Sequence, residues 1–326
     1  MKILAHAISM HRWLVVLQLS WTYLLSIAFQ RPFNPQAPLA VSIEPVNNCN
    51  LHCPECPVGN GSLTRPKRYM QPSLYHQIIN ELAPDISYLM LYFQGEPLLH
   101  PSLTDMIRYA HDKKITTMIS TNGQLLTNEK AKELVRSGLD HLVISLDGIT
   151  QDVYETYRKG GNIETTLNAI TYLNEWKKKL ASRSPFIEAQ MIVMKHNEHQ
   201  INAFKKKVKA LHADGYSLKS AQIEWTRIET WIPSRSRFAR YKKDRQGNWR
   251  LKRNLKNRCW RQWSSAVITA SGDVLPCCFD KNAEHAFGNL HDASFLEIWH
   301  NEKATAFRKA ILTNRNQFEM CRNCTS

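Results

Sequence analysis

Cysteine is absent from the middle of this 326-residue chain, between Cys56 and Cys259. The eight cysteines form a group of three near one end and a group of five near the other. Small disulfide-stapled domains distribute their cysteines densely along the chain, so this arrangement excludes a disulfide framework. It favours metal or cluster ligands in a reducing compartment, and we expect a cytoplasmic protein.

Charge is absent from Trp13–Gln30, where apolar side chains predict a helix with only a thin polar stripe. Such a helix rises about 27 Å, slightly less than the bilayer core of about 30 Å. No small-residue cleavage site follows, so we expect it to be retained and not removed as a signal peptide. Three alternatives remain open: a helix lying in the membrane interface, a buried or dimer-forming helix, and a membrane span. Pro32, Pro35 and Pro38 end the helix.

Acidic residues are nearly absent from residues 231–258, which hold eleven Lys or Arg against Asp244 alone. This segment supplies +10 of the net charge of +15, and Phe238, Tyr241 and Trp249 are interleaved with the charges. Basic segments attract anionic membranes, nucleic acids or phosphorylated substrates, but a solvated linker is an equal alternative. We expect a basic linker that, with the apolar helix, contacts the anionic inner face of a membrane.

The first cysteine group has no fourth ligand. Cys49, Cys53 and Cys56 follow the spacing C-x3-C-x2-C and supply three thiolates from one loop. A structural zinc site closes with four ligands, so this set is incomplete for zinc. An iron–sulfur cluster held by three cysteines instead leaves one iron open to a substrate or cofactor.

Between residues 39 and 230, apolar segments typical of strands alternate with helical patterns. Six such units imply a parallel sheet with right-handed crossovers, and an open (β/α)6 barrel is its natural closure. We expect strands at 41–45, 88–93, 115–120, 141–145, 186–193 and 221–225, and helices at 73–82, 103–113, 128–137, 163–179 and 200–213. In such a barrel, the chemistry belongs at the carboxyl ends of the strands.

Short polar motifs follow three of these strands. They are Gln94-Gly95-Glu96-Pro97, Ser120-Thr121-Asn122-Gly123 and Ser145-Leu146-Asp147-Gly148, and Arg158 follows the last. Each alone is an ordinary turn, helix cap or surface charge. In strand order behind the cysteine loop, they resemble the radical S-adenosylmethionine (SAM) enzymes, and this resemblance covers about residues 39–326.

The resemblance implies an α/β fold, the open partial TIM barrel of that family, in which Cys49, Cys53 and Cys56 hold a 4Fe–4S cluster that binds SAM. It implies that Glu96 accepts from the SAM ammonium and that Arg158 pairs with the SAM carboxylate. The implied cofactor-binding residues are Gly95, Glu96, Pro97, Ser120, Thr121, Asn122, Ser145, Asp147 and Arg158. Relatives usually carry an aromatic residue before the third cysteine, whereas this chain has Glu55.

The second cysteine group consists of Cys259, Cys277-Cys278 and Cys321-x2-Cys324, with a hairpin-like turn at 271–273. This order resembles the SPASM auxiliary-cluster extension in its shortened, twitch-like form. The resemblance implies that Cys259, Cys277, Cys321 and Cys324 ligate one auxiliary 4Fe–4S cluster with no open iron. We expect no second auxiliary cluster, because the later cysteines are absent.

Cys278 is the spare thiol of this group. It occupies the place where sulfatase-maturing relatives carry an acidic base, so Cys278 and Asp280 are the catalytic candidates, and Cys278 could instead replace Cys277 as ligand. Four cysteines ending in C-x2-C also suit a zinc ribbon. A non-catalytic zinc-binding protein that interacts with nucleic acid therefore remains an alternative of another class, although nucleic acid is not the expected partner.

The resemblance implies reductive cleavage of SAM to a 5′-deoxyadenosyl radical, with flavodoxin or ferredoxin as the reductant. Abstraction of hydrogen, followed by electron transfer to the auxiliary cluster, would complete a two-electron oxidation. We expect four regions: 1–38 apolar helix and proline linker, 39–230 barrel, 231–258 basic linker and 259–326 auxiliary domain. Residues 1–38 cannot form a peptide-recognition domain, so we favour a small-molecule, carbohydrate or lipid-linked substrate over a peptide- or protein-modifying activity.

Overall fold

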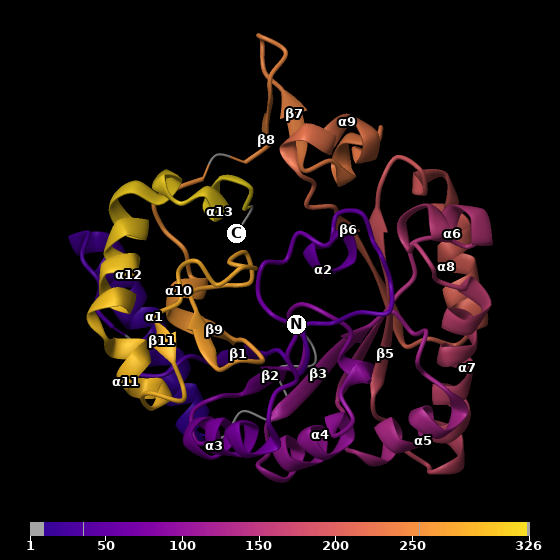
Figure 1. Ribbon diagram of the computed structural model, residues 1–326, viewed down its shortest axis with the longest axis horizontal. Coiled ribbons are helices and arrows are strands. Elements are labelled where there is room, and N and C mark those ends of the chain that lie inside the picture. The colour runs from indigo at the N-terminus through magenta and orange to yellow at the C-terminus, as the bar shows by residue number, and fades with distance from the viewer. Residues whose placement is uncertain (1–9, 35, 254, 325–326) are drawn as a thin grey trace.

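The computed structural model describes residues 10–34, 36–253 and 255–324, and Figure 1 shows a curved sheet with helices along its outer side. Six parallel strands follow one another in chain order, which confirms the predicted (β/α)6 arrangement. They are β1 (Ala40–Ile43), β2 (Tyr88–Met90), β3 (Thr116–Thr121), β4 (His141–Ser145), β5 (Phe186–Val193) and β6 (Gly215–Ser220).

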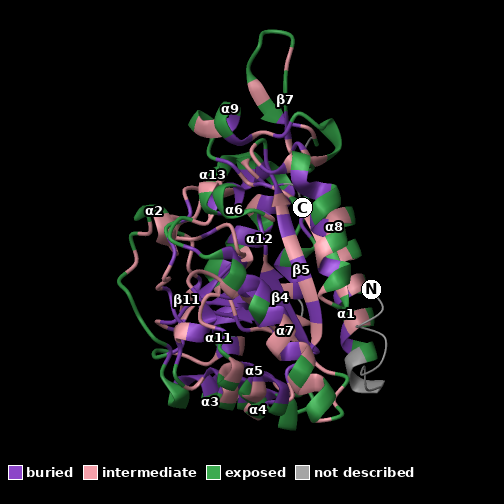
Figure 2. Ribbon diagram, turned by 90° about the vertical axis from the view of Figure 1, so that its right-hand side faces the viewer, coloured by how far each residue is buried: buried purple, intermediate pink, exposed green. Residues whose placement is uncertain are grey.

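Helices connect these strands and bury their apolar faces against the sheet (Figure 2). They are α3 (Pro72–Leu82), α4 (Leu103–Asp112), α5 (Asn128–Arg136), α6 (Gln151–Tyr157), α7 (Ile163–Lys179) and α8 (Ile201–Ala210). The short helix α2 (Pro57–Asn60), directly after Cys56, buries no residue. In α5, Thr127 caps the first turn by accepting from Lys130 N at 3.2 Å, and Ala131, Leu134 and Val135 are buried. Since helices cover one face and the barrel interior fills the other, β4 is apolar and buried almost throughout.

The position predicted for the last strand was wrong. Residues 221–225 are not a strand; β6 is Gly215–Ser220, an edge strand whose sequence is mostly polar. Ile223 is buried in a second apolar cluster with Leu51 and Tyr157. The apolar pattern after β6 therefore reflects packing near the cysteine loop and not pairing in the sheet.

The C-terminal region extends the barrel sheet. Strand β9 (Ser265–Ile268) pairs in parallel with β1, and β10 (Asp273–Leu275) and β11 (Gly288–Asn289) continue it antiparallel. The predicted turn between β9 and β10 is confirmed, with Gly272 at a φ of 88°. Four helices complete this region: α10 (Arg261–Ser264), α11 (Phe295–His300), α12 (Glu302–Asn314) and α13 (Glu319–Arg322).

The basic segment contains regular structure. After α9 (Ile228–Trp231), strands β7 (Tyr241–Lys243) and β8 (Trp249–Leu251) form a hairpin at the top of Figure 1. Tyr241 and Leu251 are buried in the second apolar cluster, whereas Lys242, Lys243 and Arg250 are exposed. The interleaved aromatic and apolar residues therefore hold the hairpin to the barrel while the charges face solvent.

Helix α1 (Met10–Phe29) is buried along one face only. Val15 and Leu19 pack with Trp263 and Leu312. Its other face exposes Trp13, Leu14, Leu17, Trp21, Leu24 and Phe29. Among the described helices, none combines the length and apolar character that a membrane crossing needs.

Candidate active site

The cysteine loop follows β1 and closes a cavity of about 230 Å³ at the carboxyl ends of the strands. Its walls include the three thiols and the polar ends of β2, β3 and β4. The residues that line it are Cys49, Leu51, Cys53, Cys56, Tyr92, Phe93, Gly95, Glu96, Ser120, Thr121, Asn122, Ser145, Tyr157, Arg158 and Ile192. Residues from four predicted motifs thus meet at this first cavity.

Gly95 allows the end of β2 to approach the cysteine loop. Its φ is +82°, and a Cβ at this position would overlap the carbonyl oxygens of Val46 and Asn48. The neighbouring Glu96 N donates to the same Asn48 oxygen at 2.8 Å. Only glycine combines the left-handed conformation with this close backbone contact.

The Glu96 carboxylate joins the ends of β2 and β3. It is 2% exposed and accepts from Thr121 Oγ1 at 2.6 Å, from Asn122 N at 2.8 Å and from Leu98 N at 3.1 Å. Burial raises the pKa of Glu96, and these three donors oppose that shift. Pro97 begins a buried turn behind the carboxylate and does not line the cavity.

Asn122 connects the third strand to the cysteine loop. Its Nδ2 donates to Asn50 Oδ1 at 2.9 Å and to Cys49 Sγ at 3.7 Å. Burial raises the pKa of Cys49 to about 11, and the Leu51 N–H, 3.4 Å from the sulfur, opposes this shift. These N–H groups are suited to stabilising a negatively charged sulfur.

Asp147 holds Arg158 against the loop. The Arg158 guanidinium donates to Asp147 Oδ2 at 2.7 Å through Nε, and its Nη1 lies 3.8 Å from Cys53 Sγ. Asp147 is fully buried, does not line the cavity, and also accepts from Ile192 N at 2.6 Å. Its carboxylate therefore positions Arg158, whose guanidinium faces the cavity.

These residues fit the cofactor that the motifs imply. Three thiols line the first cavity, and no other sulfur among the described residues does. Glu96 and Arg158 present opposite charges in the same space, which match the ammonium and carboxylate of an amino acid moiety. Ser120, Thr121 and Ser145 add hydroxyl groups to the wall.

The four cysteines of the second group lie in the same region, near enough to affect one another's pKa. Among the described residues, no three His, Cys, Asp or Glu side chains are arranged closely enough to hold a metal ion. Burial raises the pKa of Cys259, Cys277 and Cys321. Arg315, which the sequence did not single out, donates to Cys324 Sγ at 3.2 Å and opposes the pKa shift of Cys321.

The two catalytic candidates have different environments. Cys278 Sγ accepts from Arg261 Nη1 at 3.2 Å and does not line either of the cavities described here. Asp280 is 3% exposed, and its carboxylate accepts from Glu284 N at 2.8 Å and His285 N at 2.9 Å. Burial raises the pKa of Asp280, which lies in the wall of a second cavity.

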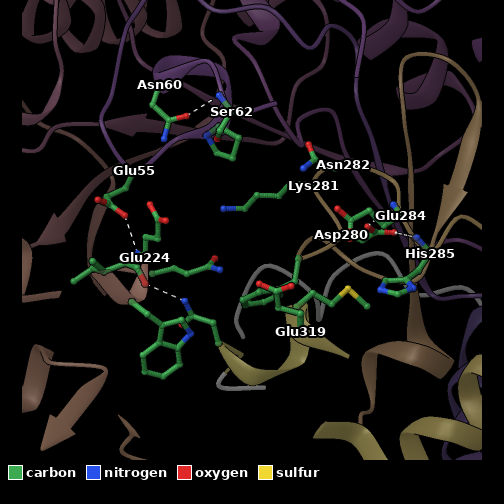
Figure 3. Close-up of a pocket in the computed structure, with 17 residues that line it drawn as sticks. Glu55, Asn60, Ser62, Glu224, Asp280, Lys281, Asn282, Glu284, His285 and Glu319 are labelled. Carbon is green, nitrogen blue, oxygen red and sulfur yellow. Dashed lines mark hydrogen bonds between the residues drawn. The ribbon is translucent and has the colours of Figure 1, made fainter. Parts of the chain in front are cut away.

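This second cavity, of about 320 Å³, lies between the cysteine loop and the C-terminal region (Figure 3). Four stretches of the chain contribute to its walls: 55–62, 222–225, 279–285 and 319–323. Glu55 belongs here and not to the first cavity, because its Oε2 accepts from Glu224 N at 2.9 Å and its Oε1 lies 3.3 Å from Arg227 Nε. The position that is usually aromatic in relatives thus forms part of an acidic wall.

A buried ion pair holds one segment of the second cavity's wall in place. Arg65 binds both oxygens of Glu44 at 2.7 Å, and its Nε donates to Lys281 O at 2.8 Å. Glu44 also accepts from Ala270 N at 3.0 Å, and Thr64 N donates to Asn282 Oδ1 at 3.1 Å. No local pattern in the sequence indicates the contacts of Arg65 with Lys281 and of Thr64 with Asn282, because these partners lie more than two hundred residues apart.

The chain belongs to the radical SAM superfamily, whose family model matches residues 43–207. A second model, the SPASM iron–sulfur cluster-binding domain, matches residues 259–325 and identifies the chain more closely as a radical SAM enzyme with an auxiliary domain. The two matches imply SAM, a 4Fe–4S cluster and auxiliary iron–sulfur binding. They support an enzyme over the zinc-binding alternative.

Several characterised proteins are similar along most of their length. The cofactor-modifying protein for tungsten-containing aldehyde ferredoxin oxidoreductase of Pyrococcus furiosus is 25% identical, over 87% of this chain and 86% of its own. The SAM-dependent 2-deoxy-scyllo-inosamine dehydrogenase of Niallia circulans is 23% identical, over 88% and 92%. The crystal structure of Streptococcus suis SuiB bound to SAM has a TM-score of 0.64 at 15% identity, covering 90% of this chain and 72% of that one, and shows the same fold.

Proposed function

We propose that this radical SAM enzyme is an oxidoreductase that removes two electrons from a small molecule bound in the second cavity. One observation carries the proposal: the second cavity lies between the two cysteine groups. Glu55 and Pro57 flank Cys56 on one side, and Phe279, Asp280 and Lys281 follow Cys277 on the other. A substrate there would have the radical-generating site and an electron acceptor on opposite sides.

The residues that line the first cavity would bind and orient SAM. When bound, SAM and its cluster supply a carbon-centred radical that abstracts hydrogen from the substrate. In our proposal, Glu96 accepts from the SAM ammonium and Arg158 donates to the SAM carboxylate. Gly95 and the hydroxyls of Ser120 and Thr121 contact the rest of the SAM molecule. Leu51, Tyr157 and Ile192 provide an apolar wall that keeps water away from reactive intermediates.

The C-terminal cysteines suit electron acceptance. We assign Cys259, Cys277, Cys321 and Cys324 as the ligands of one auxiliary 4Fe–4S cluster, with no iron left open for substrate. The Arg315 guanidinium donates to this group, and hydrogen bonds to sulfur favour the more reduced state of such clusters. Flavodoxin or ferredoxin is the proposed reductant of the first cluster.

Oxidation of an alcohol or amine also requires a proton acceptor. Of the two candidates, Asp280 lines the second cavity, and its raised pKa suits proton transfer. Cys278 is held by Arg261 and lines neither cavity. Burial raises the pKa of Tyr92 in the wall of the first cavity, and Cys278 adds to that shift. We therefore favour Asp280 as the base.

The volume of the second cavity favours a small molecule over a peptide. About 320 Å³ is at the lower end of the range for small-molecule sites. Among the similar proteins, one is named for dehydrogenation of an inosamine, whereas SuiB has been solved with its precursor peptide SuiA. Modification of a ribosomal peptide or protein is therefore the second candidate.

We further propose that the exposed apolar face of α1 lies on an anionic membrane surface, where a lipid-linked or other substrate is presented. Exposed Trp13 and Trp21 are suited to the membrane interface. The β7–β8 hairpin occupies another part of the molecule in Figure 1, so α1 alone is the proposed contact. The protein should sediment with anionic liposomes at low salt, and deletion of residues 1–38 should abolish this; binding that survives the deletion would refute the role of α1.

The proposed function is tested by measuring iron and acid-labile sulfide on anaerobically reconstituted protein, followed by incubation with dithionite and SAM. We expect about eight irons per chain and formation of 5′-deoxyadenosine. Replacement of Cys49, Cys53 and Cys56 by alanine should abolish 5′-deoxyadenosine and leave about four irons, whereas Cys278→Ala should retain both clusters. Bound zinc without 5′-deoxyadenosine would overturn the proposal.

A further inference from the structure

The second cavity differs in charge from the rest of the protein. Its wall carries Glu55, Glu224, Asp280, Glu284 and Glu319, whereas the chain as a whole has a net charge of +15. Arg227 pairs with Glu55 and Glu224, but carboxylates still outnumber cations in this wall, and walls dominated by one sign of charge concentrate ligands of the opposite sign. Such a field favours a ligand that carries a positive charge and disfavours a polyanion.

A single lysine extends into this acidic cavity. Figure 3 shows the Lys281 side chain in the middle of the space, between the segment carrying Glu55 and the loop of Asp280. Within the described part of the chain, no carboxylate forms an ion pair with its Nζ. The backbone of Lys281 is fixed, because its carbonyl oxygen accepts from the buried Arg65 at 2.8 Å.

The surroundings of the Lys281 amine favour the binding of an anion from outside the protein. Burial lowers the pKa of Lys281, while Cys56, Cys278 and Glu55 oppose that shift from longer range. Lys281 is only partly exposed, and an ammonium group that has lost part of its hydration without gaining an ion-pair partner is stabilised by a hydrogen-bonded carboxylate. The rigid backbone means that Lys281 cannot reach a distant partner by moving its loop.

We propose that Lys281 binds a carboxylate of the substrate while the acidic wall binds a positively charged amine on the same molecule. The substrate is then a small zwitterion carrying both groups. This inference rests on the proposed function of the second cavity, which it refines by assigning the substrate class. Lys281 is the specificity-determining residue, and the glutamates that surround it, Glu224 and Glu284 among them, select for the positive charge.

The test measures how fast Lys281 is acetylated in the reconstituted protein with SAM present, using anaerobic labelling and peptide mass spectrometry. The probes are 4-(trimethylammonio)butanoate, butanoate and butyltrimethylammonium, whose charged groups do not react with the acetylating reagent. We expect the zwitterion to slow acetylation about tenfold, butanoate to slow it less, and butyltrimethylammonium to leave it unchanged. Lys209, exposed on α8, is the internal control and should react at one rate throughout.

Two sets of variants separate the roles of the two charges. Lys281→Gln should weaken zwitterion binding about tenfold in calorimetry, whereas Lys209→Gln should not change it. In the double variant Glu224→Gln and Glu284→Gln, the zwitterion should slow the acetylation of Lys281 no more than butanoate does. Both glutamates are exposed, so their neutralisation should leave folding intact.

The outcomes are distinguishable. Equal slowing by the zwitterion and by butanoate would overturn the role of the acidic wall, and no slowing by either would overturn the assignment of Lys281. Lys281 does not line the first cavity, so Lys281→Gln should still form 5′-deoxyadenosine without substrate. If wild-type protein forms none, the proposed function fails, whatever the labelling shows.

Discussion

The two cavities of this protein are built in different ways. The first is made from short motifs at the ends of consecutive parallel strands, so that each motif lies beside the motif of the neighbouring strand. The second joins stretches from residue 55 to residue 323, and its walls are acidic. The barrel topology thus dictates the first cavity, where we propose that SAM binds, whereas the second cavity, where we propose that the substrate binds, depends on how the C-terminal region meets the barrel.

The largest expected effect concerns the first cavity. Arg158→Met leaves Asp147 buried without its cation, so the free energy of unfolding should fall by about 3–5 kcal/mol. Formation of 5′-deoxyadenosine should be lost together with SAM binding. Denaturant titration and a SAM-binding assay measure the two effects.

Arg108→Met is the matched control, because the Arg108–Asp105 pair is exposed and should contribute less than about 1 kcal/mol. An Arg158→Met variant as stable as this control would show that Asp147 is not held as the structure indicates.

The corresponding change at the second cavity is Arg65→Met. It leaves the fully buried Glu44 unpaired, so we expect a loss of about 3–5 kcal/mol of unfolding free energy here too. It also releases the Lys281 carbonyl and thus the loop that forms the cavity wall. In the folded fraction, zwitterion binding should weaken while SAM binding is retained; equal loss of both would mean that the two cavities are not independent.

Gly95→Ala tests the contact between β2 and the cysteine loop. The new methyl group would overlap two carbonyl oxygens as well as adopting a positive φ. Gly160→Ala is a close control, because its φ of +81° is nearly the same but nothing lies within 4 Å of the added carbon. Gly160→Ala should lower the free energy of unfolding by about 1 kcal/mol, whereas Gly95→Ala should lower it more and also reduce SAM binding. Equal losses in the two variants would contradict the close approach of residue 95 to the cysteine loop.

The smallest effect lies outside both cavities. A hydrogen bond from His141 lowers the pKa of Glu188 to about 2. Since this pKa is depressed, the stabilisation is present above the unfolded value of about 4.3 and is lost as the pH falls toward 2. After allowance for solvent screening, it is about 1 kcal/mol. Glu188→Gln should remove this part of the acid sensitivity in pH-dependent unfolding, without changing SAM binding; an unchanged acid profile would contradict the assignment.

The sequence alone determined the barrel and the first cavity. Apolar strands alternating with helices permit few topologies, and residues at the carboxyl ends of parallel strands must meet at one edge. Cys49, Gly95, Asn122 and Arg158 therefore lie together as predicted. The site roles assigned to them remain predictions, to be tested by the variants above.

Only the tertiary structure decided the second cavity and the ends of the sheet. The pairing of β9 with β1, the Arg65–Glu44 ion pair and the place of Lys281 join residues that no local pattern relates. The strand expected at residues 221–225 was wrong for the same reason: burial against the cysteine loop and pairing in a sheet both favour apolar residues. Periodicity reports which side chains are buried, but the partners that bury them are chosen by long-range packing.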